Sequence, residues 1–198
     1  MIRILLIVFL TLIPSALLCA ETPGEIVIEA IEQSLEVLRA PSLQGPEKTA
    51  QRKEKIREVL EPMFNFYEMS KRSLGRHWKN CTAEEREEFT QIFTDILRET
   101  YLDRSTSYSG EKIIYIRENT QNIRSKVQTN IITTEGKKIS VDFSMIKNNN
   151  AWKIYDITIE GVSTVGNYRS QFNSILNESP FSHLIKELQK KQKEFADT

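Results

Sequence analysis

The residue types that most often carry out chemistry are sparse in this sequence of 198 residues, and none stands in a recognisable catalytic motif. The two histidines, His77 and His183, have no second histidine or cysteine at the spacing of a zinc site. Ser163 has no base near it in the sequence, and there is neither a G-x-S-x-G elbow nor a glycine-rich phosphate loop. We therefore expect a protein without catalytic residues, metal or cofactor.

Asp156 is the best candidate for a general base, because it lies in a segment whose alternate positions are apolar. We favour a structural role for this carboxylate, since buried polar groups are normally hydrogen-bonded. One alternative is an enzyme with a cone-shaped α+β fold that uses Asp156 and Tyr155 on a small apolar substrate. Another is an interaction module whose apolar face binds a partner protein.

Residues 1–20 have the order of a secretory signal peptide. A basic Arg3 precedes an apolar run from Ile4 to Ile13, and small residues lead to a cleavage point after Ala20. The run is too short to span a bilayer as a helix, which takes about 20 residues. Lipidation at Cys19 is disfavoured because a leucine precedes it, where a lipobox has a small residue. We predict an exported protein that consists of residues 21–198.

The charge balance argues against nucleic acid as a partner. The chain has 27 basic and 27 acidic residues, and removal of Arg3 leaves 26 basic ones (27 minus 1). Nucleic-acid binding usually shows as a strong basic excess. Cleavage also leaves Cys81 as the single cysteine, so we expect no internal disulfide. The remaining length fits one domain with its own core.

The first half of this domain, residues 21–105, has the apolar spacing of helices. Apolar residues recur at steps of three and four from Val27 onward, and Pro41 ends this first helix. Thr82 and Glu85 form a capping box that opens a long helix. The apolar face of that helix carries Phe89, Ile92, Phe93, Ile96, Leu97 and Tyr101.

The second half, residues 112–198, changes to a period of two. Four segments have the pattern of strands: Ile113–Arg117, Ile123–Thr134, Lys138–Lys147 and Trp152–Val162. Alternation makes one sheet face apolar and the other polar, so helices must cover the apolar face. Two closing helices, Gly166–Leu176 and Phe181–Phe195, complete the pattern. We predict an α+β fold with helices packed on a twisted antiparallel sheet of about four strands.

Three groups of short motifs stand out by their order and spacing. They are Leu74-Gly75-Arg76-His77-Trp78, then Trp152-Lys153-Ile154-Tyr155-Asp156 with Glu160-Gly161-Val162-Ser163, and finally Asn167-Tyr168-Arg169-Ser170-Gln171-Phe172. With the aromatic face of the long helix, they make residues 26–188 resemble the MlaC family of periplasmic phospholipid shuttles, also called the toluene-tolerance family. The resemblance implies a deep apolar pocket for phospholipid tails, with the head group at its mouth.

The resemblance also implies a cellular role. The protein would be periplasmic and would carry phospholipid between an outer-membrane lipoprotein complex and an inner-membrane ABC transporter with an MCE-domain ring, in support of outer-membrane lipid asymmetry. The shared apolar faces then predict which side chains contact acyl chains. The expected set is Phe89, Phe93, Tyr101, Val127, Ile131, Val141, Phe143, Ile157, Ile159, Val162, Tyr168 and Phe172.

Overall fold

The computed structural model describes residues 21–105 and 110–196, so the predicted signal peptide lies outside the described part of the chain. The described helices are α1 (Pro23–Arg39), α2 (Thr49–Leu60), α3 (Phe66–Leu74), α4 (Ala83–Ser105), α5 (Thr164–Glu178) and α6 (Phe181–Ala196). The strands are β1 (Lys112–Gln121), β2 (Arg124–Ile132), β3 (Lys138–Asn148), β4 (Ala151–Ile159) and β5 (Val162–Ser163). The predicted α+β fold is confirmed, with five strands instead of about four.

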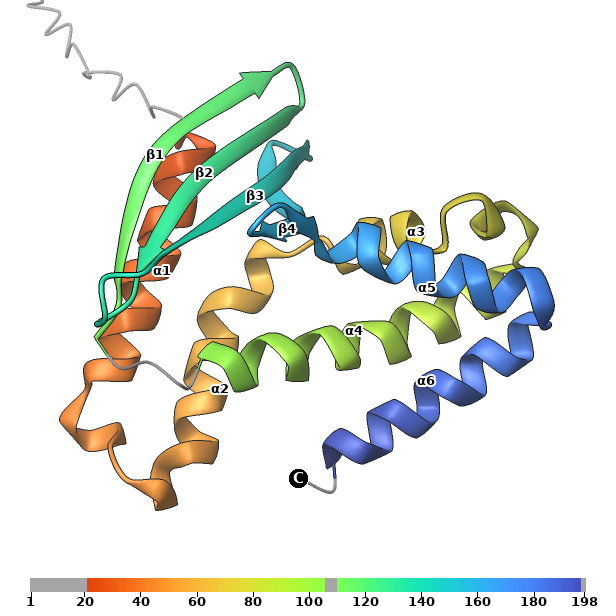
Figure 1. Cartoon of the computed structure of the whole chain (residues 1–198), viewed down its shortest axis with the longest axis horizontal. Helices are drawn as coiled ribbons and strands as arrows, with labels where there is room; N and C mark the ends of the chain where they lie inside the picture. The colour runs from red at the N-terminus through yellow and green to blue at the C-terminus, as the bar shows by residue number, and fades with distance from the viewer. Residues whose placement is uncertain (1–20, 106–109, 197–198) are drawn as a thin grey trace, which may run out of the picture.

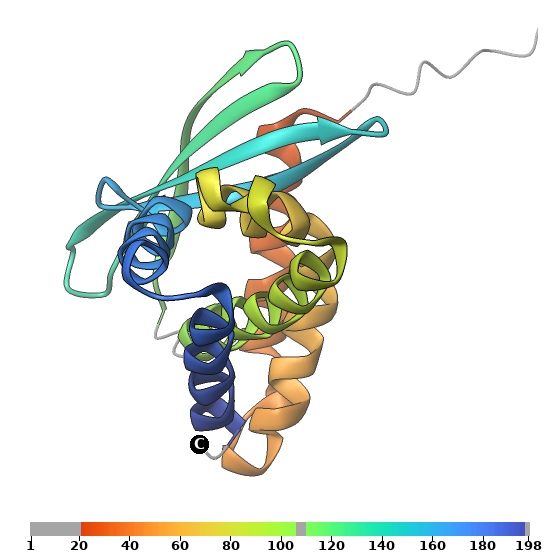
Figure 2. The ribbon, with the colours of Figure 1, turned by 90° about the vertical axis from the view of Figure 1, so that its right-hand side faces the viewer.

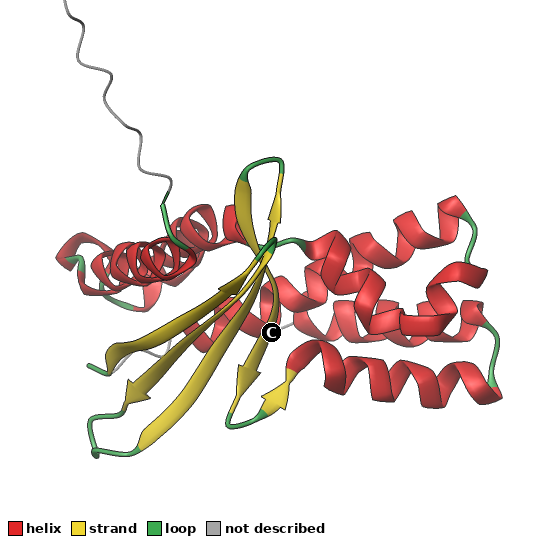
Figure 3. Ribbon diagram, turned by 90° about the horizontal axis from the view of Figure 1, so that it is seen from above, coloured by secondary structure: helices red, strands yellow, loops and turns green. Residues whose placement is uncertain are grey.

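The sheet is an open antiparallel meander in the order β1-β2-β3-β4-β5. Hydrophobic residues pair directly across its strands, as in Ile131 with Ile139 and Phe143 with Ile157. The register shifts once in β1, between Tyr115 and Arg117, and once between β3 and β4, after Ser144. Seen from above, the strands fan apart beside the helices (Figure 3).

The fifth strand arises where the sequence predicted a continuous one. The segment Trp152–Val162 is interrupted after Ile159, because Glu160 and Gly161 both have positive φ, 49° and 81°. Two successive residues of positive φ form the tight turn that suits a two-residue hairpin. Val162 therefore pairs back onto Ile159 and does not extend β4. Glu160 is held in this turn by its carboxylate, which accepts hydrogen bonds from the backbone N–H (2.5 Å) and hydroxyl (3.1 Å) of Ser140.

The helices form two groups around the sheet. Helix α1 lies along one face of β1 and β2, and α2 packs on α1 and joins it to α4 (Figure 1). Helices α3, α4, α5 and α6 pack together to one side (Figure 1). Turned by 90°, the sheet runs along the top of the molecule with the helices beneath it (Figure 2). No helix in the described residues is long and apolar enough to cross a membrane.

Local sequence signals fix where several helices begin. Thr22 accepts a hydrogen bond from the backbone of Glu25, and the Glu25 side chain accepts one in return, which is a capping box. The predicted box at Thr82 and Glu85 is present, with hydrogen bonds of 2.8 and 3.2 Å. Such caps satisfy backbone N–H groups that have no partner inside the helix.

Most of the buried hydrophobic residues in the described part of the chain form two clusters. The helical core, within α3 to α6, includes the fully buried side chains Phe89, Phe93 and Leu184. The sheet core lies between the sheet and α1, and includes Val27, Val127 and Met145 among others. The aromatic rings of the helical core touch edge to face, for example Phe93 and Tyr168 with centroids 4.9 Å apart. The two cores differ in how completely they are filled.

Candidate functional site

An apolar cavity of about 440 Å³ lies between the sheet and α1. Three sets of residues surround it: a stripe along α1, the apolar face of the sheet from the start of β1 to β4, and the end of α2 with the segment that follows it. In full, the lining consists of Val27, Ala30, Ile31, Ser34, Leu35, Leu38, Leu60, Met63, Phe64, Glu111, Ile113, Ile131, Thr133, Ile139, Val141, Phe143, Ile154, Ile157 and Ile159. Most of these are aliphatic, so the cavity is built to hold an apolar group.

Incomplete burial of several lining residues distinguishes this cavity from an ordinary hydrophobic core. Ile31, Leu35, Ile139 and Phe143 are only partly buried, although they face the interior between two elements. Protein interiors are normally packed as densely as organic crystals, with few voids larger than a water molecule. The sheet and α1 therefore do not fill the space between them with their own side chains.

The lining contains a few polar residues, but the buried one, Ser34, leaves the cavity apolar. The hydroxyl of Ser34, in the middle of the α1 stripe, donates to the carbonyl of Ala30 at 2.7 Å. A satisfied hydroxyl presents its carbon atoms to the cavity at little cost, whereas an unsatisfied one costs about 1–3 kcal/mol. Glu111 and Thr133 lie at the opposite end of the cavity from Phe64, near the start of β1 and the end of β2.

The cavity has the length of a lipid tail. Its lining along α1 runs from Val27 to Leu38, and eleven steps of 1.5 Å give about 16 Å. The hydrocarbon core of a bilayer is about 30 Å thick, so the tails of one leaflet reach about 15 Å. Its volume corresponds to about 18 carbons, because a 150 Å³ cavity takes up benzene, at about 25 Å³ per carbon.

The residues predicted to contact acyl chains lie partly in the cavity lining and partly elsewhere in the fold. Five line the cavity, and they are Ile131, Val141, Phe143, Ile157 and Ile159. Val127 is fully buried in the sheet core beside it. Phe89, Phe93, Tyr168 and Phe172 lie together in the helical core, where they contact one another. Val162 is 62% exposed on β5, and the side chain of Tyr101 lies outside the described residues.

The residues that the prediction omitted come mainly from α1 and from the segment after α2. The signal for α1 was present, since its apolar residues recur at the same three- and four-residue steps as the cavity stripe. The periodicity showed that this stripe faces inward. It carried no information about whether the facing sheet leaves a gap.

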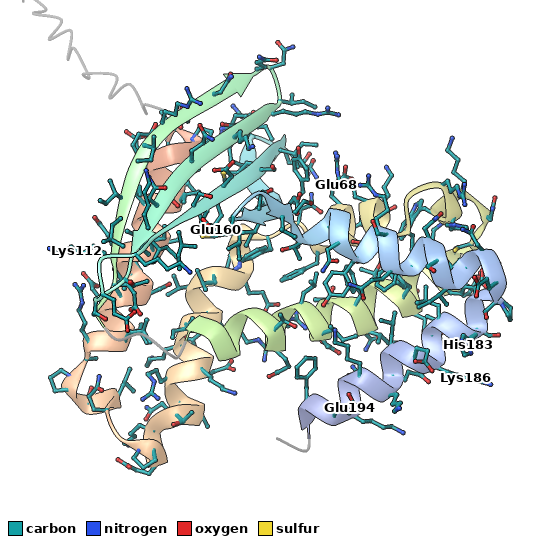
Figure 4. The ribbon with its side chains drawn as sticks, in the orientation of Figure 1. Glu68, Lys112, Glu160, His183, Lys186 and Glu194 are labelled. Carbon is teal, nitrogen blue, oxygen red and sulfur yellow. The ribbon has the colours of Figure 1, made fainter. Side chains whose placement is uncertain are left out.

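Asp156 and Ser163, two of the candidates for chemistry, hydrogen-bond to each other and to the backbone. Asp156 accepts from the hydroxyl of Ser163 (2.6 Å) and the backbone N–H of Val165 (2.9 Å), at the start of α5. The Ser163 hydroxyl in turn accepts from the Gly166 N–H and caps α5. His183 is exposed on α6 (Figure 4). In the described residues, no group of three or more acidic, histidine or cysteine side chains could hold a metal ion.

Cys81 is buried and has no disulfide partner in the described residues. Burial raises the pKa of its thiol, and the nearby Glu85 carboxylate raises it further, which together outweigh the effect of Arg86. A thiol with a raised pKa is a poor nucleophile, because the thiolate is the reactive form. Cys81 therefore packs as a small apolar residue of the helical core.

An ion-pair network lies beside Phe64, at one end of the cavity. Arg57 contacts Glu61 at 2.8 Å, and Arg98 contacts both Glu61 and Asp95. Partial burial tends to raise the pKa of Glu61, but hydrogen bonds from Arg57 and Arg98 outweigh it, so the pKa lies below its ordinary value. Glu61 is thus held ionised between two arginines.

Together, the open sheet, the covering helix and the incompletely filled space between them define an α+β protein with an apolar ligand cavity. The family model for the MlaC protein matches residues 29–190. The chain belongs to the MlaC family.

The chain is similar to one relative of known name and to one solved structure. The chain is 30% identical over 139 residues to the intermembrane phospholipid transport system binding protein MlaC of Haemophilus influenzae, a match that covers 68% of this chain and 65% of that protein. A solved structure of a phospholipid-binding protein from Ralstonia solanacearum, in complex with a phospholipid, has a TM-score of 0.75 and 21% identity. That match covers 89% of this chain and 99% of the other, and it shows that the fold is shared.

Proposed function

We propose that this protein is a periplasmic phospholipid carrier that holds acyl chains in the cavity between α1 and the sheet. The observation that carries the proposal is the unfilled apolar space, which is as long as the tails of one membrane leaflet. Membership of the MlaC family and the names of the two relatives support the same ligand class. In this proposal the acyl-chain contacts come from the cavity lining, which includes five of the sequence-predicted residues.

The energetics favour a carrier that needs no chemical step. Burial of a chain of about 16 carbons is worth about 13 kcal/mol at about 0.8 kcal/mol per CH₂, so a tail cannot stay in water. A bilayer buries the same tail, however. The free-energy difference between carrier and membrane can therefore be small, and the lipid can be loaded and unloaded by binding alone.

The size of the cavity limits what it encloses at one time. At about 440 Å³ it holds roughly one tail. A two-tailed lipid therefore places its second chain in additional space, through outward displacement of side chains that are already only partly buried, such as Leu35 and Phe143. We expect the loaded protein to protect these side chains from solvent.

The proposed route follows from the family. The exported protein would take up phospholipid at an outer-membrane lipoprotein complex and deliver it to an inner-membrane ABC transporter with an MCE-domain ring, or the reverse. The signal-peptide pattern of residues 1–20 supports passage into the periplasm. Cleavage would leave a chain that starts at Glu21, immediately before the Thr22 cap of α1.

Native mass spectrometry of the full chain, expressed with its signal sequence and purified from the periplasm, tests the proposal. We expect an N-terminus at Glu21 and a mass increment that matches one phospholipid, which solvent extraction releases. A protein that carries no extractable lipid, and takes none up from vesicles after purification, would contradict the proposal and favour an interaction module.

A further inference from the structure

A second, polar groove lies on the other side of the segment that ends the apolar cavity. Its volume is about 700 Å³, and it is formed by one face of α2, by the segment up to Phe66, and by the β3–β4 hairpin. We call it the outer groove. The residues that matter for its chemistry are Glu54, Arg57, Glu58, Phe64, Phe66 and Lys153.

The outer groove and the apolar cavity share one wall. In the segment from 60 to 64, Leu60 and Met63 face the cavity, whereas Glu61 and Pro62 face the groove. Phe64 lines both spaces. Phe64 is only partly buried, and its ring stacks on that of Phe66 with centroids 5.5 Å apart. A ligand that leaves the cavity past Phe64 therefore enters the groove directly.

The outer groove offers charges of both signs. Arg57 is fixed by Glu61 and lies 3.6 Å from a carboxylate oxygen of Glu54. The ammonium group of Lys153 donates to the carbonyl of Pro62, which ties β4 to the same segment. The side chains of Glu54 and Glu58 are 61% and 63% exposed. Glu54 pairs with Arg57 at 3.6 Å, and Glu58 pairs with Lys55 at 3.9 Å. Exposed pairs of this kind are weak and exchange partners easily.

The charges balance when the ion-pair partners next to the groove are counted. The groove itself has three carboxylates, Glu54, Glu58 and Glu61, and two cations, Arg57 and Lys153. Arg98, which contacts Glu61 and Asp95, and Lys55, which contacts Glu58, bring the total to four positive and four negative charges. A neutral site that presents both signs complements a ligand that also carries both signs, and a purely anionic ligand leaves the exposed carboxylates opposed to it.

We propose that the outer groove binds the head group of a zwitterionic phospholipid, one that joins a phosphate to an amine. The phosphate would lie by Arg57 and Lys153, because a guanidinium and an ammonium are the usual protein partners of phosphate. The amine would lie by Glu54 and Glu58 and against the ring of Phe64, since ammonium groups are attracted to carboxylates and aromatic faces. The ring of Phe66 already has the Arg98 guanidinium over it, 5.6 Å from its centroid. This inference rests on the proposed function, in which the tails occupy the apolar cavity.

Competitive loading tests this selectivity. Delipidated full-length protein is incubated with mixed vesicles that contain equal amounts of phosphatidylethanolamine and phosphatidylglycerol, and the bound lipids are counted by native mass spectrometry. We expect at least a fivefold excess of the ethanolamine lipid. Glu58→Gln should bring the ratio close to one, because it removes a partner of the amine, while the total lipid bound stays the same. Lys153→Gln should keep the excess, because both lipids carry the phosphate that Lys153 would contact. Lys126→Gln, on the polar face of the sheet beside Asp142, is the matched control and should keep the excess.

A second measurement separates the groove from the cavity. Glycerophosphoethanolamine has the head group without tails, and glycerophosphoglycerol is its anionic counterpart. We expect NMR shifts at Asn65 and Asn148, which line the groove, with the first compound and at least tenfold weaker shifts with the second. Equal lipid loading together with no difference between the compounds would overturn the head-group site and leave the carrier function standing. No loading of either lipid would instead refute the carrier function.

Discussion

Replacing Leu35 with tryptophan should block the cavity without removing the fold. Leu35 lies in the middle of the α1 stripe and is only partly buried, so its side chain has space in front of it. The substitution adds about six non-hydrogen atoms, or roughly 150 Å³ at 25 Å³ per atom. That is about one third of the 440 Å³ cavity.

The lost cavity volume should lower the affinity of the protein for the acyl chain. A ligand that gives up about six buried carbons loses about 5 kcal/mol at 0.8 kcal/mol per CH₂. Since each 1.4 kcal/mol is a factor of ten, binding should weaken by about a thousandfold to ten-thousandfold. This is an upper value, because a flexible tail can bend around the indole. Stability should change little, since a tryptophan that fills an existing cavity does not have to force the neighbouring side chains apart.

The assay is the affinity of delipidated protein for a fluorescent phospholipid, together with the lipid that co-purifies and the midpoint of urea unfolding. Val37→Trp on the same helix is the matched control, because Val37 does not line the cavity. We expect the control to bind normally. If Leu35→Trp retained both affinity and co-purified lipid while the protein remained folded, the acyl chains would not lie in this cavity.

Three further predictions concern residues outside the cavity. Phe93→Ala should cost about 3–5 kcal/mol in the urea-derived free energy of unfolding, because it empties the helical core, while the lipid bound per folded molecule stays unchanged. Asp156→Asn should cost about 1–3 kcal/mol, since it weakens the contacts to Ser163 and Val165, and should leave lipid transfer between vesicles intact; loss of transfer in a folded variant would favour a chemical role. Glu61→Gln should destabilise the protein at pH 7 by about 0.5–1 kcal/mol, allowing for solvent exposure. The folded-state pKa of Glu61 is lowered, so its contribution is present above about pH 4.3 and is lost as the pH falls through the lower folded-state pKa. A wild-type-to-variant difference in thermal unfolding that grew as the pH was lowered below about 4.3 would contradict this reasoning.

Residues of the first and third family motifs hold the helical body together. Arg76 donates to Asn177 at 2.6 Å, and His77 contacts Asn173 at 3.2 Å, so the first motif ties η4 (Gly75–Asn80), the turn after α3, to α5. Arg169 of the third motif donates to the carbonyl of Arg72 at 2.7 Å. These contacts assemble the helical body and lie outside the cavity lining. The resemblance therefore identified the family, and four of the residues predicted to contact acyl chains, Phe89, Phe93, Tyr168 and Phe172, lie in the helical core and not in the cavity lining.

The strand pattern predicted which sheet residues face the cavity, with one exception. On β3, Val141 and Phe143 alternate with polar residues and face the cavity as their period predicts. The exception is Val162, where a turn at Glu160 and Gly161 breaks the predicted strand. Glutamate rarely adopts a positive φ, so Gly161 was the only residue in the local sequence that indicated this turn.

The sequence by itself predicted an export signal, and it determined the change from helices to strands, the α+β class and the two opposite faces of the sheet, because these depend on residue type and spacing along the chain. Only the tertiary structure decided which apolar faces close on each other. The aromatic face of α4 meets α5 and α6 in a filled core, whereas the α1 stripe stands away from β2 and β3. A gap depends on the distance between two elements and on the volumes of side chains from both, and neither quantity is encoded within a single segment.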